Sequence, residues 1–255
     1  MQFFISHLID TTDFLELVSQ YPVGIESIHF SLSEVLDKGL AETTKYKETL
    51  QPFIKERPLT LHGPFFDLSP ASFDSKIKKV TMERFEEVYQ IARQLGASKI
   101  IFHSGFIPQV YFVEGWLYKS ITFWKEFMSN KEDSITICIE NVFETDYAPI
   151  LELIRQVNHP HFKMCLDIGH VNAYSPIPLI EWIQNLKAYI SHVHLHNNHG
   201  SKDEHLGLSN GSINVPECLK LLSEFITDHL TITLEIYDLH DLKDSLHTLT
   251  TLNYL

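Results

Sequence analysis

FKMCLDIGH, residues 162–170, is a short apolar run that ends in an aspartate and a histidine. Seven further runs of this kind open successive segments of the chain, and seven of the eight end in, or continue into, a His, Asp or Glu. They are FFISHL (3–8), VGIESIHF (23–30), LTLHG (59–63), KIIFHSG (99–105), ITICIEN (135–141), YISHVHLHN (189–197) and LTITLEIY (230–237). A parallel barrel gathers the C-terminal ends of all its strands around one mouth. The pattern therefore predicts a metal site built on a barrel.

Amphipathic stretches lie between these runs and predict helices. They are TTDFLELVSQY (11–21), KVTMERFEEVYQIARQLG (79–96, with Gly96 as C-cap), GWLYKSITFWKEFM (115–128), APILELIRQV (148–157), PLIEWIQNLKAY (178–189), VPECLKLLSEFITDH (215–229) and DLKDSLHTLTTL (241–252). Eight predicted strands, with amphipathic stretches between them, indicate a parallel sheet covered by helices. We expect an α/β fold, a single (β/α)8 TIM barrel forming one domain over residues 1–255. A doubly wound open sheet is the alternative, but it needs no ring of ligands at every strand end.

The length and composition suit one barrel domain, with 255 residues of which 44% are apolar. No apolar run approaches the roughly twenty residues of a membrane span, and the N-terminus lacks the features of a secretory signal. A cytoplasmic protein without a membrane partner is the expectation. Cys138, Cys165 and Cys218 show no CxxC spacing and are expected to be buried thiols.

The formal charge of −13 disfavours nucleic acid as a partner, since nonspecific affinity for DNA comes mainly from Lys and Arg on phosphates. The one short basic run, residues 76–79, lies on a predicted helix, where a solvated face is its expected role. Fifteen histidines are more informative. Those at strand ends need a metal or a hydrogen-bond partner for both ring nitrogens.

Three carboxylates, Glu140, Asp167 and Glu235, would converge at the predicted mouth. Like charges at close range cannot all stay ionised unless a cation lies between them. His194 adds a nitrogen, and a mixed oxygen and nitrogen set suits Zn²⁺ or Mn²⁺ better than Mg²⁺.

Further candidate ligands are His62, His103, His170, Asp203 and His205. Asp203 and His205 are two residues apart, so both could point the same way in an extended loop. Asp167 and His170 leave the same strand end, and Gly169 between them is expected to allow a tight backbone path.

Three long loops are expected at the mouth and should shape substrate choice, namely residues 63–75, 105–114 and 197–214. Their aromatic residues could form an apolar lid, a stacking surface or simply helix packing; they are Phe65, Phe66, Phe106, Tyr111, Phe112 and Trp116. His192 and His196 share a strand face with His194, so one of them could support a ligand. Asn141 could orient substrate or a ligand.

The ordered motifs LHGP, FHSG, IEN, LDIGH, HVHLHN, DEH, LGLSNGSI and LEI cover nearly the whole chain. Through these motifs and their order, the sequence resembles the xylose isomerase-like barrel superfamily and, within it, the zinc-dependent apurinic endonuclease IV group. The resemblance implies up to three divalent metals per chain, most readily Zn²⁺, with Mn²⁺ as an alternative. It assigns them to His62, His103 and Glu140; to Glu140, Asp167, His194 and Glu235; and to His170, Asp203 and His205.

This resemblance implies a positive metal cluster that binds an anionic phosphate, in the manner of multimetal hydrolases. The leading hypothesis is hydrolysis of a phosphoester in a small phosphorylated substrate. Glu140, Glu235 and His170 are then the expected catalytic residues, with Glu140 bridging two metals and Glu235 accepting a proton.

Sugar and sugar-phosphate isomerases and epimerases of the superfamily are the alternative. They are similar to this chain through one four-ligand site, in which Glu140 and Glu235 would also shuttle a proton. An Arg is typical of them after the seventh strand, where this chain has Lys202 and Asp203. An apurinic endonuclease ranks third, because GPFFDLSP and GFIPQVYF carry almost no Lys or Arg, and a metal-binding protein without catalysis ranks last. The expected partner is thus a small phosphorylated or polyhydroxylated molecule, and the oligomeric state is left open.

Overall fold

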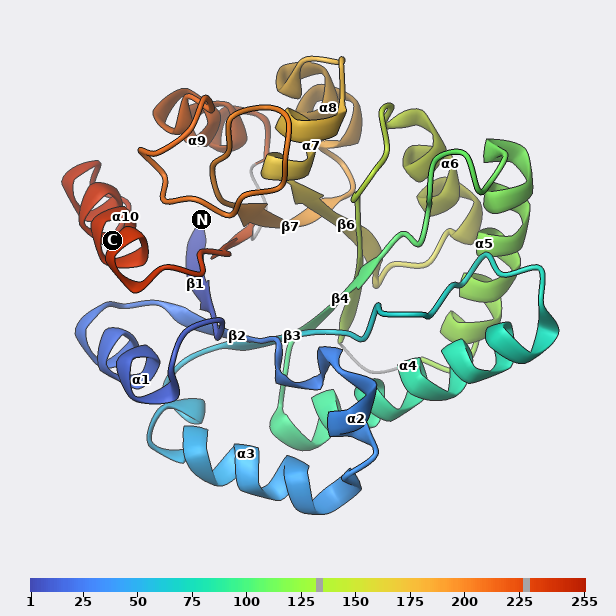
Figure 1. The fold of residues 1–255 in the computed structure, drawn as a ribbon, viewed down its shortest axis with the longest axis horizontal. Coiled ribbons are helices and arrows are strands. Elements are labelled where there is room, and N and C mark those ends of the chain that lie inside the picture. The colour runs from blue at the N-terminus through green and yellow to red at the C-terminus, as the bar shows by residue number, and fades with distance from the viewer. Residues whose placement is uncertain (132–134, 227–229) are drawn as a thin grey trace.

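Eight parallel strands close into a barrel in the computed structural model, which describes residues 1–131, 135–226 and 230–255. The strands are β1 (Gln2–Ser6), β2 (Gly24–Ser27), β3 (Leu59–His62), β4 (Lys99–His103), β5 (Thr136–Glu140), β6 (Phe162–Asp167), β7 (Ile190–Leu195) and β8 (Thr231–Leu234). Each strand pairs with its sequence neighbour, and β8 pairs with β1. The predicted (β/α)8 barrel is confirmed, and the open-sheet alternative is wrong (Figure 1).

Helices surround the barrel on its outside (Figure 1). They are α1 (Thr11–Gln20), α2 (Ser33–Leu36), α3 (Gly39–Ile54), α4 (Ser75–Leu95), α5 (Val113–Met128), α6 (Ala148–Val157), α7 (Ile168–Tyr174), α8 (Leu179–Leu186), α9 (Val215–Phe225) and α10 (Leu239–Thr251), with a 3₁₀ turn, η1, at His29–Ser31. No helix in the described part of the chain is long and apolar enough to cross a membrane.

The helix boundaries differ from the predicted ones in instructive ways. Helix α4 begins at Ser75 and not at residue 79, because the Asp74 carboxylate caps it by accepting from the backbone N–H of Lys76 at 2.8 Å. Gly96 ends it as expected, with a φ of 74°. Helix α3 is absent from the predicted set, since polar residues interrupt its apolar spacing. The helix predicted at 178–189 is shorter, and residues 227–229 of the one predicted at 215–229 lie outside the described residues.

Strand alternation sends side chains either inward or outward. Outward residues such as Phe102 pack against helix residues such as Phe85, whose ring lies 4.1 Å away, and build the large core between strands and helices. Inward residues Ile101, Cys138 and Cys165 form a separate small cluster within the barrel. All three cysteines are buried and free, as predicted.

The lower part of the barrel interior holds a hydrogen-bonded polar floor, made of Glu26, Thr60, Lys99, His192, Thr231 and Thr233. Glu26 Oε2 accepts from Thr60 Oγ1, Thr233 Oγ1 and His192 Nε2, each at 2.9 Å.

The floor continues downward from His192. Thr231 Oγ1 donates to His192 Nδ1 at 2.5 Å, and Lys99 Nζ donates to Thr231 Oγ1 at 2.8 Å. Burial lowers the pKa of Lys99. This network supports the candidate ligands above it.

Candidate metal centre

The strand register brings the predicted ligands together at the barrel mouth. His103 is the register partner of Glu140, and Asp167 is the register partner of His194. His62 ends β3, while Glu235 follows β8 directly. The convergence expected from the ends of the apolar runs is therefore observed.

Glu140 lies between two sets of histidines and is 1% exposed. Its Oε2 atom is 3.3 Å from His62 Nε2 and 3.5 Å from His103 Nε2. Its Oε1 atom is 3.4 Å from both His170 Nδ1 and His194 Nδ1. Each carboxylate oxygen thus faces a different group of nitrogen ligands.

His194 Nδ1 faces the carboxylates of the central group. This atom is 3.5 Å from Glu235 Oε2 and 3.8 Å from Asp167 Oδ2, in addition to its contact with Glu140. The ligand atoms of Glu140, Asp167 and His194 all lie within 4.8 Å of one another, as do those of His62, His103 and Glu140.

Asp203 joins His170 and His205 in a third group. Its Oδ2 atom is 3.2 Å from His170 Nε2 and 3.0 Å from His205 Nε2. The expected extended loop is wrong, however, because His205 has a φ of 49°. The left-handed turn, and not strand-like alternation, brings the two side chains together.

Backbone carbonyls set the orientation of three of the histidines. The Nδ1–H groups of His62, His170 and His205 donate to the carbonyls of Gly63, Asn141 and Glu235, at 2.8 to 2.9 Å. Their Nε2 atoms are left facing carboxylate oxygens, which cannot donate. Each such contact needs either a second proton on the ring or a cation between the two atoms.

Buried atoms without hydrogen bonds mark the same place. Among the described residues, the buried atoms without a hydrogen bond include Glu140 Oε2, both ring nitrogens of His194 and Asp203 Oδ1 at the mouth, besides a few elsewhere such as Ser120 Oγ. Buried polar atoms are seldom left in this state. Together with the histidine orientations, this donor set of imidazoles and carboxylates fits divalent cations.

The electrostatic field of the centre favours positive charge. Burial lowers the pKa of His170, but Asp167, Asp203 and Glu140 outweigh burial and raise it to about 10. Burial also lowers the pKa of His205, but the carboxylates of Asp203 and Glu235 outweigh burial and raise this pKa to about 9. Burial, reinforced by the charge of Glu140, raises the pKa of the Glu235 carboxyl, although His194 opposes this.

Glu26 was not among the predicted site residues. Its Oε1 atom is 3.0 Å from His194 Nε2, on the opposite side of the ring from the central carboxylates. A carboxylate at this position orients a ligating imidazole and strengthens it as a ligand. The inward alternation of the run VGIESIHF carries the signal that could have identified it.

His196 lies beside the third group and contacts the candidate ligand Asp167, in the supporting position that its shared strand face with His194 allows. Its Nε2 atom is 3.3 Å from Asp167 Oδ1 and 3.6 Å from Asp203 Oδ1, and its ring stacks on His205 at 4.0 Å. Gly169 lies against this ring, because a Cβ there would be 1.9 Å from His196 Cε1. Gly169 is therefore required for space, and the backbone reason expected from the sequence is wrong.

Asn141 supports a candidate ligand. Its side-chain amide donates to the Asp167 carbonyl at 3.0 Å, and its side-chain oxygen accepts from the Asp167 N–H at 2.9 Å. Both polar atoms of the amide are thus occupied in fixing the end of β6 beside Glu140.

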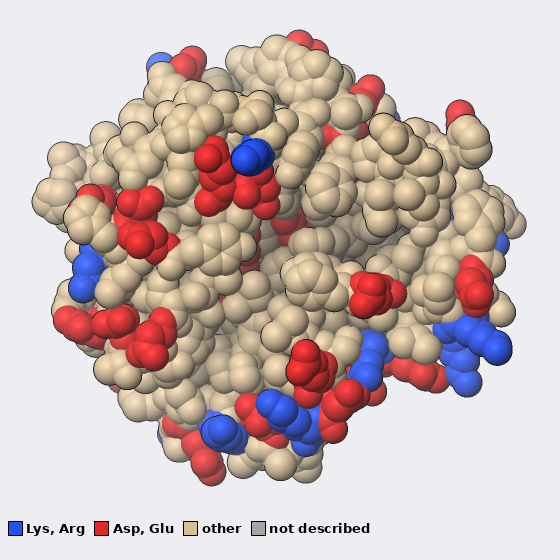
Figure 2. All heavy atoms as spheres, viewed as in Figure 1, with Lys and Arg blue, Asp and Glu red and all other residues tan. Residues whose placement is uncertain are grey.

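A cavity of about 490 Å³ opens above the ligands. Seven of the nine predicted ligands line it, namely His62, His103, Glu140, His170, Asp203, His205 and Glu235. Figure 2 shows this hollow in the middle of the viewed face. Asp167 and His194 are fully buried beneath the lining.

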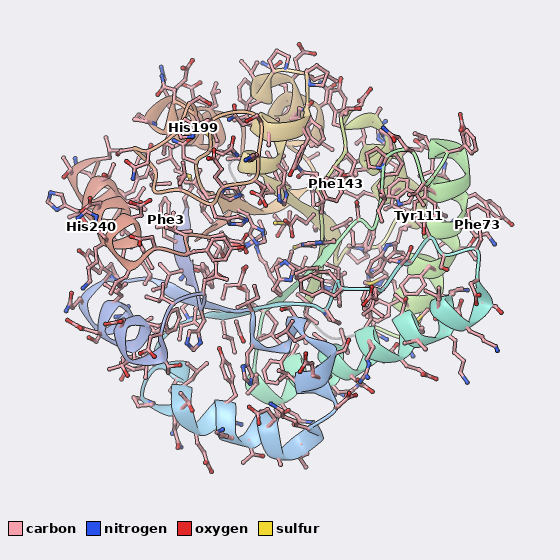
Figure 3. The ribbon with its side chains drawn as sticks, in the orientation of Figure 1. Phe3, Phe73, Tyr111, Phe143, His199 and His240 are labelled. Carbon is pink, nitrogen blue, oxygen red and sulfur yellow. The ribbon has the colours of Figure 1, made fainter. Side chains whose placement is uncertain are left out.

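The predicted aromatic lid is only partly correct. Phe65, Phe66 and Phe106 line the cavity, whereas Tyr111, Phe112 and Trp116 do not. Trp116 is buried and donates from Nε1 to the Ser104 carbonyl at 3.2 Å. Tyr111 pairs with Ser69 and stacks on Phe73, on the outer side of the molecule (Figure 3).

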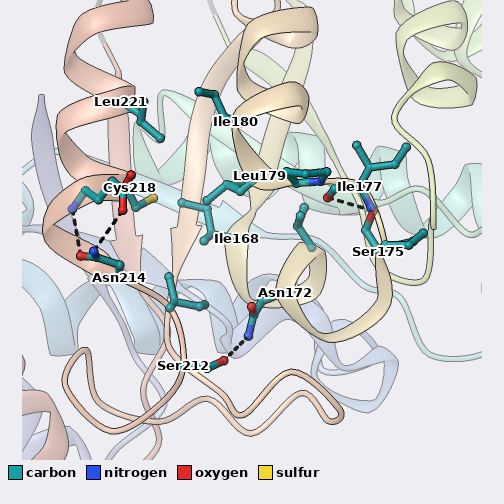
Figure 4. A pocket seen from close by; sticks show the side chains of 15 residues that line it. Ile168, Asn172, Ser175, Ile177, Leu179, Ile180, Ser212, Asn214, Cys218 and Leu221 are labelled. Atoms are coloured by element: carbon teal, nitrogen blue, oxygen red, sulfur yellow. Dashed lines mark hydrogen bonds between the residues drawn. The ribbon is translucent and has the colours of Figure 1, made fainter.

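A second cavity of about 380 Å³ lies beside α7, α8 and α9 (Figure 4). Its polar side chains bond to one another, since Asn172 Nδ2 donates to Ser212 Oγ and Asn214 Nδ2 to Glu217 Oε2, both at 3.0 Å. Its lining residues include no histidine beside a carboxylate. Among these two cavities, the residues that could hold a metal are therefore at the barrel mouth.

Comparison with known proteins agrees with this arrangement. The sequence model of the family described as xylose isomerase-like TIM barrel matches residues 21–252. An uncharacterized protein of Methanocaldococcus jannaschii is 32% identical over 73% of this chain and 67% of its own length. "Probable endonuclease 4" of Mycobacterium leprae is 22% identical over 61% of this chain and 65% of its own length.

Among solved structures, a D-tagatose 3-epimerase-like protein superposes with a TM-score of 0.83 at 27% identity. The match covers 98% of this chain and 96% of that one. The fold, the ligand groups at the mouth and the match over residues 21–252 lead to one conclusion: this chain belongs to the xylose isomerase-like TIM barrel family.

Proposed function

We propose that this protein is a metal-dependent hydrolase of phosphoesters in small substrates, with a multinuclear Zn²⁺ or Mn²⁺ centre. One observation carries the proposal: the two oxygens of Glu140 face different sets of histidines, His62 and His103 on one side and His170 and His194 on the other. A site for one metal on Glu140, Asp167, His194 and Glu235 has no use for His62 and His103 beside the other oxygen of Glu140. Nine ligands exceed what one ion can coordinate.

The nine proposed ligands form three groups, with the interatomic distances given above. His62 and His103 share Glu140 Oε2, while Asp167, His194 and Glu235 complete the central group with Glu140 Oε1. His170, Asp203 and His205 form the third, with His196 beside them. Bound divalent cations would supply Lewis-acid stabilisation of the phosphoryl oxygens and activate water.

The protein side chains would handle the proton. Glu235 lines the cavity and is the proposed acceptor of the proton lost by the attacking water. The water oxygen forms a bond to phosphorus as the bond from phosphorus to the ester oxygen breaks, and this oxygen leaves as an alcohol with the proton that Glu235 had accepted. His170 lines the cavity with its Nδ1–H on the Asn141 carbonyl and its Nε2 facing Asp203, so it would act on the phosphoryl group through the cation that it helps to hold.

A sugar or sugar-phosphate isomerase or epimerase is the second candidate. Glu140 and Glu235 lie on the central group, 3.4 and 3.5 Å from the same atom, His194 Nδ1. Such a pair could shuttle a proton at a carbon beside a carbonyl, and one metal would suffice. The 27% identity to the D-tagatose 3-epimerase-like protein favours this candidate.

The metal count and one pair of variants distinguish the two candidates. We expect elemental analysis of metal-saturated protein to give more than one divalent metal per chain. The His205→Ala variant removes a ligand of the third group and should lower phosphoester turnover by about a hundredfold or more. The matched control is His199→Ala, which removes an exposed histidine of the same loop that pairs with Glu204.

One metal per chain, or unchanged phosphoester turnover in His205→Ala, would refute the multimetal hydrolase. Metal-dependent turnover of a ketose that survives His205→Ala would establish the isomerase. Duplex DNA is not a proposed substrate, because the described cavity lining includes no Lys or Arg to pair with flanking phosphates. Tight, salt-sensitive binding to abasic duplex would restore the third candidate, the apurinic endonuclease.

A further inference from the structure

Five aromatic residues of the cavity form what we call the aromatic wall: Phe65, Phe66, Phe143, Tyr174 and Tyr237. The wall begins at the ligands themselves, because the Phe65 ring stacks on His103 at 4.3 Å with an interplanar angle of 19°. Phe66 continues it outward, 4.2 Å from Phe65. The aromatic surface thus starts where the reacting group would be bound.

The wall continues on the side of the third ligand group. The Tyr237 ring lies 4.7 Å from His205, and the Tyr174 ring lies 6.1 Å from His170. Phe143 packs on Tyr174 at 5.3 Å and is labelled near the mouth in Figure 3. Aromatic rings therefore flank ligands of both outer groups, His103 on one side and His170 and His205 on the other.

Three of these rings are open to solvent in spite of their apolar faces. Phe66 is 59% exposed, Tyr237 is 56% exposed and Phe143 is 40% exposed. Exposed apolar surface gathered around a cavity is typical of a site that binds an apolar group. Leu8, Ile28 and Ile107 add aliphatic surface to the same lining.

The charges of the lining point the same way. Its ionisable side chains are acidic or histidine, and the described lining residues include no Lys or Arg. Figure 2 shows most blue groups along the lower and right margin of this face, with one among the red groups just above the hollow. Within the lining, an anionic group can then be held only at the proposed metal centre, and a second anionic group there would meet acidic residues such as Asp67.

We propose that the substrate is an ester carrying a single phosphate group and an aromatic or similarly planar apolar group, which stacks on the aromatic wall. This inference rests on the proposed phosphoester hydrolysis and specifies its substrate class. A polyhydroxylated group would fit poorly, because the wall offers it few polar partners. The cavity volume of about 490 Å³ suits a ligand of this size.

Two substrates with leaving groups of similar reactivity test the proposal. The zinc-loaded protein is assayed with 2-phenylethyl phosphate and with glycerol 1-phosphate, which both release a primary alcohol. Stacking and burial of one ring should favour 2-phenylethyl phosphate about tenfold or more in kcat/KM, mainly through KM. A ratio near one, with both substrates hydrolysed, would overturn the inference and leave the hydrolase proposal standing.

Two variants test whether the preference for 2-phenylethyl phosphate depends on the aromatic wall. Phe66→Ala should reduce the ratio of the two kcat/KM values several-fold, since it removes an exposed ring of the wall without touching a ligand. Phe112→Ala is the matched control, because Phe112 is 87% exposed but lies outside the lining. An unchanged ratio in Phe66→Ala, or an equal loss in both variants, would contradict the assignment of the wall.

Binding separates this inference from the proposed function. The non-hydrolysable 2-phenylethylphosphonate should bind the zinc-loaded protein at least about tenfold more tightly than 2-hydroxyethylphosphonate in calorimetry. If neither phosphate is hydrolysed but this preference is found, the hydrolase proposal fails and the aromatic site stands. Equal affinity of the two phosphonates would refute the aromatic site directly.

Discussion

The mouth of the barrel and the polar floor beneath it contain similar residue types but differ in how far their buried polar atoms are hydrogen-bonded. In the floor, Glu26 Oε2 alone accepts three hydrogen bonds, while the other oxygen, Oε1, faces His194 of the mouth and makes no hydrogen bond. At the mouth, Glu140 Oε2 and His194 Nδ1 are buried without a hydrogen bond. A satisfied buried network stabilises a fold, whereas an unsatisfied one at the same depth indicates that a ligand completes it.

Glu26 connects the two regions. Its Oε2 atom belongs to the floor, and its Oε1 atom lies 3.0 Å from the proposed ligand His194. The floor therefore holds one imidazole of the mouth in place, through a carboxylate that is itself held by three donors. The comparison predicts that substitutions impair metal binding less the deeper they lie below the mouth. Substitutions in the floor should still lower the stability of the fold.

The largest effect is expected at Glu140, which faces four histidines. Glu140→Gln removes the charge shared by two ligand groups and should remove at least one equivalent of metal and nearly all activity. Elemental analysis and steady-state assays measure this. A variant that keeps its full metal content and turnover would contradict the proposed bridging role of Glu140.

An intermediate effect is expected at Glu26. Glu26→Gln keeps the shape of the side chain but weakens the acceptor that faces His194 Nε2, so metal affinity should fall about 10- to 100-fold. Competition with a chelator of known affinity measures it. Glu144→Gln is the matched control, a buried glutamate that accepts from Ser104 Oγ and from the Val142 N–H at 2.7 Å. An equal loss of metal affinity in both variants would show that Glu26 stabilises the fold in general and does not act on His194 specifically.

The smallest effect on metal binding is expected at Lys99, at the bottom of the floor. Lys99→Met leaves the Ser191 carbonyl and Thr231 Oγ1 without their donor and should lower the free energy of unfolding by about 1–3 kcal/mol. Metal content should stay unchanged. Denaturation in urea, with elemental analysis of the same samples, provides the check. A loss of metal in a folded Lys99→Met protein would show that the two regions are not separable.

Much of the site could be predicted from local patterns. An inward ligand at the end of a parallel strand depends on strand alternation and on the common mouth of a barrel, and both follow from short stretches of sequence. All nine proposed ligands, from His62 to Glu235, were identified in this way or through the family resemblance. Glu26 was not predicted because it lies one position before the end of β2. Nothing in the neighbouring sequence indicates that its carboxylate faces His194.

The loops were less predictable for a physical reason. Asp203 and His205 meet through a left-handed residue, and nothing in their spacing requires it. Tyr111 and Trp116 turn away from the cavity, while Tyr174 and Tyr237 enter the aromatic wall from other segments. Backbone turns and packing against neighbouring loops decide where a loop side chain points.

The sequence by itself determined eight apolar strands, seven of the helices around them and the residue types that end each strand, because periodicity and burial act over short stretches of chain. Only the tertiary structure decided which atoms face one another: Glu140 with four histidines, Glu26 with His194, and His196 with Asp167. Those pairings depend on the register between strands and on closure of β8 onto β1. Contacts across a closed barrel join residues far apart along the chain, so no local pattern specifies them.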